Sequence, residues 1–161
     1  MSEYITTGIS EFDINKFVKP INRRCFNKPY GGLWGCRYEP ENEYVSSWVE
    51  WCIGENFDAD LKTGIIYSLK DDNRKYTINS YGNLKAIVNK YPLRDEAIPK
   101  GMFNPVMDYE AIQNKYDVIE LTYQGQCTTR LSHPHSLYGW DVACILILNP
   151  DIITNVRPWH E

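Results

Sequence analysis

The sequence predicts a single domain of mixed α+β class. A chain of 161 residues accommodates one hydrophobic core, and dividing it would leave two marginal ones. The pattern of apolar residues gives about six or seven strand-like segments and three or four short helical ones. These strands do not alternate strictly with helices, which disfavours a regular βαβ sheet and favours a mixed sheet over residues 1–161.

The first part of the chain predicts two strands and two helices. Residues 4–10 and 30–36 have strand character, and residues 11–20 are compatible with a short helix that ends at Pro20. Residues 42–56 predict an amphipathic helix, with Glu50 facing outward and Gly54 ending it. Its apolar residues recur at helical spacing and are Val45, Trp48, Val49 and Cys52.

The rest of the chain predicts further strands around two capped helices. The expected strands are residues 63–69, 76–78, 117–123, 140–148 and 151–156. Ser80 is expected to cap a helix that runs through Tyr91, and Asp108 is expected to cap a helix over residues 109–116. Between these elements, residues 92–105 predict a long loop and residues 124–139 an irregular polar segment.

Charge and cysteine content exclude several classes of protein. With a formal net charge of −4 and no run of more than two Lys or Arg, a large nucleic-acid surface is not expected, although a small nucleotide needs few donors. The five cysteines are odd in number and scattered, which argues against a disulfide scaffold or a structural zinc site. We expect them to be small buried side chains in a reducing compartment.

The first residues do not form a signal peptide and no apolar run is long enough for a membrane span, so we expect a cytoplasmic protein.

The segment 27–36, "NKPYGGLWGC", has the composition of a nucleotide cradle. Pro29 fixes the backbone before Tyr30, and Gly31 and Gly32 permit conformations that other residues avoid. Without side chains at the glycines, a ligand can approach the peptide groups, while Trp34 and Tyr30 provide ring faces for stacking. A glycine turn that leads into a strand with a core tryptophan explains the same residues. The segment alone leaves both interpretations open.

Three motifs together resemble the ADP-ribosyltransferase superfamily. The combination "GGLWGC…SSWVEWC" resembles that family's glycine–aromatic strand and the Ser-bearing helix after it, with Trp34 in the place of the stacking tyrosine. "YITTGIS" is similar to the family's first strand, and "LYGWDVACILILNPDIITNV" to its closing strands. The motifs occur in the family's order and cover about a third of the chain. The resemblance implies a split, strongly bent mixed sheet with short helices, ADP-ribosyltransferase-like, and NAD as substrate.

The resemblance also assigns residues to the site. Thr7 and Gly8 stand where the family has His-Gly, and Ser47 lies on the helix that follows the cradle, so all three are expected to contact NAD with Tyr30, Gly31, Gly32 and Trp34. Asp141 is the acid nearest to the position of the catalytic glutamate, one carbon shorter, and would stabilise the transition state as nicotinamide leaves. Asp141 as a structural partner for a turn at Gly139 is the alternative.

The polar segment before the last strands is expected to contribute the remaining contacts. Arg130 is suited to a bidentate contact with the diphosphate. In the resembled family this loop recognises the acceptor, which implies acceptor contacts for Gln124 and Gln126. His133 and His135 flank Pro134, but no spacing supports a metal site, and none is expected.

Two functions follow as expectations. The first is an NAD-dependent ADP-ribosyltransferase that modifies a protein or nucleic-acid acceptor, of the kind found among toxins, defence factors and phage-borne host-modifying proteins. The second is a catalytically silent module on the same fold that binds a nucleotide or blocks a partner protein. The departures at Thr7 and Asp141 favour the silent module, and the intact glycine–tryptophan segment favours the enzyme.

Overall fold

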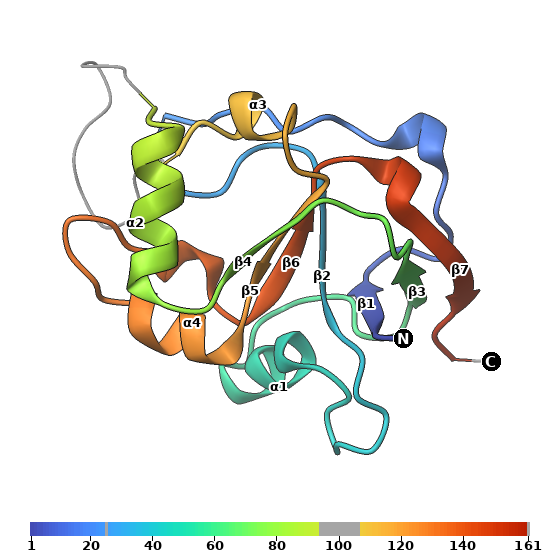
Figure 1. Ribbon diagram of the computed structural model, residues 1–161. Coiled ribbons are helices and arrows are strands. Elements are labelled where there is room, and N and C mark those ends of the chain that lie inside the picture. Colours follow the sequence, from blue (N-terminus) through green and yellow to red (C-terminus); the bar gives the residue numbers. More distant parts are fainter. Residues whose placement is uncertain (25, 94–106, 161) are drawn as a thin grey trace.

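A computed structural model describes residues 1–24, 26–93 and 107–160, and its strands form one mixed sheet (Figure 1). The sheet has seven strands in the order β4-β5-β6-β2-β1-β3-β7, in which only β4 and β5 run parallel to each other. Four short helices complete this α+β domain. The strands are β1 (Glu3–Thr7), β2 (Leu33–Arg37), β3 (Gly64–Leu69), β4 (Lys75–Ile78), β5 (Val118–Leu121), β6 (Cys144–Ile147) and β7 (Ile153–Pro158). The helices are α1 (Ser47–Gly54), α2 (Tyr81–Lys90), α3 (Tyr109–Ile112) and α4 (Tyr123–Thr129).

The central strand β2 changes its pairing partner partway along its length. Its first three residues pair with β6, from Leu33 opposite Ile147 to Gly35 opposite Ile145. On its other side, β2 pairs with β1 only at Cys36 and Arg37. The two halves of the sheet are therefore joined through one short strand, and a cleft lies at this junction.

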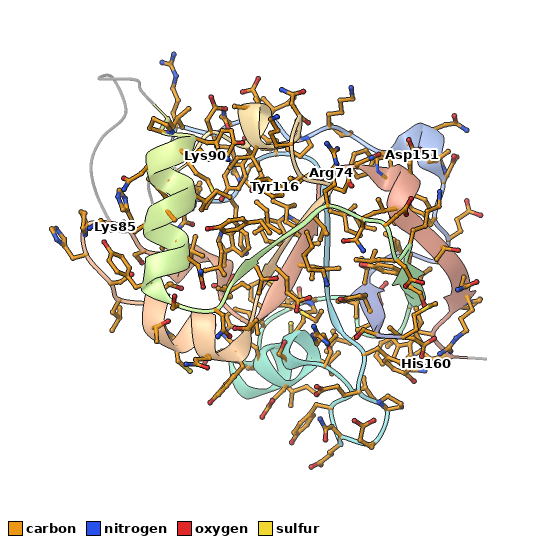
Figure 2. All side chains as sticks on the ribbon, in the orientation of Figure 1. Arg74, Lys85, Lys90, Tyr116, Asp151 and His160 are labelled. Atoms are coloured by element: carbon orange, nitrogen blue, oxygen red, sulfur yellow. The ribbon has the colours of Figure 1, made fainter. Side chains whose placement is uncertain are left out.

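The core occupies both faces of the sheet. Every residue of β6 is buried, as expected for a strand covered on both sides. Leu146 belongs to the cluster under α2, which also contains Leu84 and Ile87, whereas Ile145 and Ile147 belong to the cluster on the opposite face. Side chains fill the space between α2 and the sheet, and the exposed Lys85 lies on the outer side of that helix (Figure 2).

Most predicted strands and the helix capped by Ser80 are confirmed, but the helix expected over residues 11–20 is wrong. That segment contains only a single 3₁₀ turn at Ile14–Lys16, which Asp13 caps and which ends where Phe17 becomes extended. The helix expected over residues 42–56 starts later, at Ser47, because the Ser46 hydroxyl accepts a hydrogen bond from the Val49 amide and caps it.

Three further expectations need correction. Residues 124–139 are not irregular throughout. Their first six residues belong to α4, which Thr122 caps. The strand expected over residues 140–148 is confined to β6, because a 3₁₀ turn ends at Trp140 and Asp141 then has a positive φ, with the Val142 amide bonded back to the Trp140 carbonyl. The helix expected over residues 109–116 is only the single turn α3. Of the long loop predicted over residues 92–105, residues 94–105 lie outside the described residues.

The cysteines only partly follow the expectation. Cys36, Cys52 and Cys144 are buried, whereas Cys127 is exposed on α4, and Cys25 lies outside the described residues. Within the described part of the chain, no helix combines the length and the apolar character that crossing a membrane requires.

Candidate functional site

A cleft opens where β1 and β2 separate. The strands are paired at Ile5 and Cys36, but the next positions, Thr6 and Gly35, are not paired. Instead, the Thr6 hydroxyl donates a hydrogen bond of 2.7 Å to the Trp34 carbonyl and lies 3.0 Å from the Tyr67 hydroxyl. Gly35 is required here, because a Cβ at this position would lie 2.2 Å from the Tyr67 oxygen. The side-chain bond of Thr6 thus replaces a backbone bond and leaves space between the strands.

Tryptophan rings form much of the wall of this cleft, which has a volume of about 470 Å³. Trp34, Trp48 and Trp140 all line it. The rings of Trp34 and Trp140 are perpendicular, with centroids 4.9 Å apart. Trp140 is buried and its indole N–H donates to the Asn27 carbonyl at 3.0 Å, so this wall is held in place from behind. The volume falls within the usual range of small-molecule pockets, and the rings suit a planar ligand.

Two cationic side chains lie at the same cleft. Lys28 Nζ is 2.9 Å from Asp141 Oδ2 and 5.3 Å from the centroid of the Trp34 ring. The Arg23 guanidinium lies 4.1 Å from the centroid of the Tyr30 ring and 4.7 Å from that of Phe26. Both Lys28 and Arg23 line the cleft. Positive charge beside aromatic rings suits an anionic ligand that also carries a planar ring.

Asp141 occupies an unusual backbone conformation at the edge of the cleft. Its φ of 63° and ψ of −52°, with the Val142 amide bonded to the Trp140 carbonyl at 2.7 Å, are those of a γ-turn. This turn is rare and strained for a residue with a side chain, and such strain occurs preferentially at functional sites. The turn aims the Asp141 carboxylate at Lys28, with which it forms an ion pair that is about one-third exposed on each side.

The structure brings some of the residues predicted from sequence together. Thr7, Gly32 and Trp34 line the cleft. The carboxylate of Asp141 forms an ion pair with Lys28, which also lines the cleft. The Gln126 side-chain amide donates to the backbone carbonyl of Asp141 at 3.3 Å, so these two polar residues are neighbours. Asp141, however, does not stand directly before a strand, because β6 begins three residues later.

The glycine pair has a structural explanation within the chain itself. Gly31 and Gly32 have φ of +72° and +69°, and a Cβ on Gly31 would lie 2.6 Å from the carbonyl oxygens of Val18 and Lys19. The Gly32 amide donates to the Val18 carbonyl at 2.8 Å. The left-handed turn and the close approach of residues 18–19 therefore account for both glycines, and the Gly32 N–H is already hydrogen-bonded to protein.

Several predicted contacts do not line the cleft. Tyr30 is 59% exposed and Gly8 is exposed. Gly31 lies against the backbone of Val18 and Lys19. The Ser47 hydroxyl donates to the Ala143 carbonyl at 2.8 Å and lines a neighbouring cavity of about 580 Å³. Gln124 is exposed on α4, and Arg130 caps the C-terminus of that helix, with its guanidinium 5.4 Å from the centroid of the Tyr138 ring.

The thiols at the cleft are not activated. Cys36 and Cys144 line the cleft, and burial raises the pKa of Cys36 to about 11 and that of Cys144 well above its usual range. A thiol with a raised pKa is protonated at neutral pH and is a poor nucleophile. These cysteines serve as packing groups at the back of the cleft. Among residues 1–24, 26–93 and 107–160, no His, Cys, Asp and Glu side chains are grouped so that they could hold a metal ion.

Sequence reasoning missed Lys28, Arg23 and Trp140. The first had a local signal, since Lys28 directly precedes Pro29 in the glycine–tryptophan segment. Trp140 had none, because the residues that hold it in the cleft, Trp34 and Asn27, lie more than a hundred residues earlier in the chain. Comparisons of the chain with family models, with curated proteins and with solved structures find no match.

Proposed function

We propose that the cleft between β1 and β2 binds NAD and that the protein transfers ADP-ribose from NAD to a protein or nucleic-acid acceptor. The observation that carries this proposal is the convergence of Trp34, Trp140, Lys28 and Arg23 on one cleft. NAD combines planar rings with an anionic diphosphate, and these residues offer aromatic surface and two positive charges. The resemblance of the strand and helix motifs to the ADP-ribosyltransferases supports the same ligand.

The proposed reaction breaks the bond between ribose C1′ and the nicotinamide nitrogen. Nicotinamide leaves with the bonding electron pair, and a nucleophile of the acceptor forms a bond to C1′ and loses its proton. The ribose carries positive charge as the first bond breaks, and a nearby carboxylate stabilises that charge. Asp141 is the carboxylate at the edge of the cleft, and in this proposal Lys28 moves from Asp141 to the diphosphate when NAD binds.

A silent nucleotide-binding module is the second candidate, and one observation favours it specifically. Lys28 neutralises Asp141 at 2.9 Å, so the carboxylate lacks a free negative charge in the structure described. Thr7, at the position of the family's histidine, offers only a hydroxyl. In this case NAD or a related nucleotide binds the cleft and no nicotinamide is released.

The decisive experiment is titration of the full chain with NAD, by calorimetry and by tryptophan fluorescence. We expect Trp34→Ala to weaken binding by roughly ten- to a hundredfold, because stacking on an aromatic side chain contributes about 1–3 kcal/mol. Trp159→Ala is the matched control, since Trp159 lies after β7 and stacks on His160. If Trp34 only fills the core, its removal should instead cost about 3–5 kcal/mol of stability. Absence of NAD binding by the parent protein would overturn the proposal.

Catalysis and the class of acceptor require separate measurements. Nicotinamide release distinguishes the enzyme from the silent module once NAD binding is established. Incubation with labelled NAD and a cell lysate, followed by separation of protein from nucleic acid, identifies the fraction that receives the label. Bound NAD without release would support the silent module.

A further inference from the structure

The charges of this chain are unevenly distributed along the sequence. Between Asp13 and Glu39 there are six Lys or Arg residues and no Asp or Glu, so all 21 acidic residues lie outside this segment. Five of the six cations fall within residues 14–30, namely Lys16, Lys19, Arg23, Arg24 and Lys28, and of these Arg23 and Lys28 line the cleft. A positive segment in an acidic protein favours the approach of anions to that surface.

Residues 21–24 and 26–30 belong to a loop that is closed at its base, and we call these described residues the basic loop. Ile21 and Tyr30 exchange both backbone hydrogen bonds, each of 2.9 Å, and so close its base. Asn27 is fully buried and pins its centre, because its carbonyl accepts from the Tyr109 hydroxyl and the Trp140 indole, and its side-chain amide donates to the Ser136 carbonyl. The loop is therefore held at its base and at its centre, and it exposes the rings of Phe26 and Tyr30.

The outward side chains combine exposed rings with a cation. Phe26 is 45% exposed and Tyr30 is 59% exposed, and the Arg23 guanidinium lies against both rings. Among the described residues Arg23 has no carboxylate partner. A guanidinium stacked on rings keeps its N–H edge available for phosphate, while exposed rings offer faces on which bases stack.

Four acidic side chains of the described residues near this surface have partners within the chain. Asp141 pairs with Lys28, and Glu11 lies 3.9 Å from the highly exposed Lys16. Asp108 and Glu110 accept hydrogen bonds from Asn22 at the side of the loop. Lysines offset two of these negative charges, whereas the hydrogen bonds from the uncharged Asn22 leave those of Asp108 and Glu110 in place at the side of the loop.

We propose that the basic loop, together with the neighbouring Lys19, binds single-stranded nucleic acid beside the cleft that Arg23 and Lys28 line. The identification of this strand as the acceptor rests on the proposed function, but the binding itself does not. Phosphates contact the cations and unpaired bases stack on Phe26 and Tyr30. Bases within a duplex are already stacked on one another, so a single strand is preferred to a duplex.

The test uses fluorescence anisotropy to measure how tightly the full chain binds fluorescein-labelled single-stranded DNA and RNA. Strands of about 20 nucleotides are long enough, because single-strand sites typically span about 4–16 nucleotides. We expect Phe26→Ala to weaken binding by roughly fivefold or more, because it removes one stacking surface. Lys19→Gln should lower the dependence of log K on log salt between about 50 and 200 mM by about 0.7, the value for one phosphate contact with a single strand. The matched controls Tyr123→Ala and Lys62→Gln replace an exposed aromatic and an exposed lysine outside residues 14–30 and should leave binding unchanged.

Several outcomes would overturn this proposal. These are no binding of single strands at about 50 mM salt, equal effects of the loop and control variants, tighter binding of the duplex, or preferential binding of vesicles rich in anionic lipid. Near-UV circular dichroism checks that Phe26→Ala folds, and Lys19→Gln gives an independent result if it does not. Binding of NAD without nucleic acid would refute only the basic loop, and binding of nucleic acid without NAD would refute only the proposed function.

Discussion

Replacing Asp141 with Asn tests whether its carboxylate has a catalytic role or a structural one. The change removes the charge but keeps the shape and the hydrogen-bonding oxygen. Asn also adopts positive φ more readily than most residues, so the γ-turn at position 141 is retained. The main structural loss is the ion pair with Lys28, whose atoms are 2.9 Å apart.

The expected loss of stability is small. Both side chains of the pair are about 30% exposed, which places it near the upper end of the range for surface pairs, about 1 kcal/mol. For a chain of this length, that loss lowers Tm by about 2–4 °C. Calorimetry or thermal denaturation followed by circular dichroism measures it.

The expected loss of catalysis is much larger. If the Asp141 carboxylate stabilises the transition state, Asp141→Asn should slow nicotinamide release by about 10²–10³-fold, the usual effect of losing one well-placed electrostatic group. The dissociation constant of NAD should change little, because the group acts mainly in the transition state. Release is measured by chromatography and binding by calorimetry, with the exposed Asp151→Asn as control.

Two results would refute this reasoning. Unchanged nicotinamide release in Asp141→Asn would remove the carboxylate from the mechanism. A Tm lowered far beyond the range expected for a surface pair, with NAD binding lost in parallel, would show that Asp141 is structural. Lys28→Gln then distinguishes the effect of losing the ion pair from the effect of losing the carboxylate, because it removes the partner of Asp141 and keeps the acid.

Two further predictions concern stability. The bidentate Arg74 guanidinium lowers the pKa of Asp117 from 3.8 to about 2, so Asp117 contributes stability that is present above pH 3.8 and is lost as the pH falls toward 2. After allowance for the half-exposed Arg74, the contribution is about 1–2 kcal/mol, and Asp117→Asn should flatten acid unfolding in this window. Gly139→Ala would place a methyl 2.4 Å from the Asn27 side-chain oxygen and should cost about 1–3 kcal/mol in chemical denaturation, whereas Gly54→Ala, whose Cβ meets nothing within 4 Å, should cost nothing.

The elements that the sequence predicted correctly are those with local signals. The α2 helix has a capping serine, Ser80, directly before a stripe that buries Leu84, Ile87 and Val88, and all of these lie within one short segment. The β3 strand is largely apolar, with Ser68 as its polar residue, and is buried along its whole length. In both cases propensity, capping and burial agree, so tertiary contacts were not needed to recognise the element.

The elements that sequence reasoning missed depend on distant contacts. The α4 helix contains Gly125 and polar residues that gave no apolar stripe, yet Gly125 allows the helix to pack against the carbonyl of Ile78, since a Cβ there would lie 2.0 Å from that oxygen. In the opposite case, residues 11–20 have near-helical apolar spacing but contain only one 3₁₀ turn, and the carbonyl of Val18 bonds the Gly32 amide in place of a helical partner. In both segments the tertiary contact outweighs the local pattern.

The candidate site shows the same division. Trp34 and the glycines were found because they stand together in the sequence, although the glycines prove to be explained by the approach of residues 18–19. Lys28 could be placed beside Asp141 only after the fold was known, because 113 residues separate them. A cleft formed by distant segments leaves no short motif that reveals all its members.

One buried residue connects the parts of this site. The Asn27 carbonyl accepts the Trp140 indole hydrogen, and Trp140 both packs against Trp34 and bonds through its own carbonyl to the Val142 amide across the γ-turn of Asp141. Lys28 follows Asn27 directly in the chain, so the anchor that orders the basic loop also fixes the base of the cation that pairs with Asp141. A ligand that draws Lys28 away from Asp141 therefore acts on a strained turn and an exposed loop that share a single buried support. This arrangement provides a physical route by which occupation of the cleft would alter the surface that the basic loop presents.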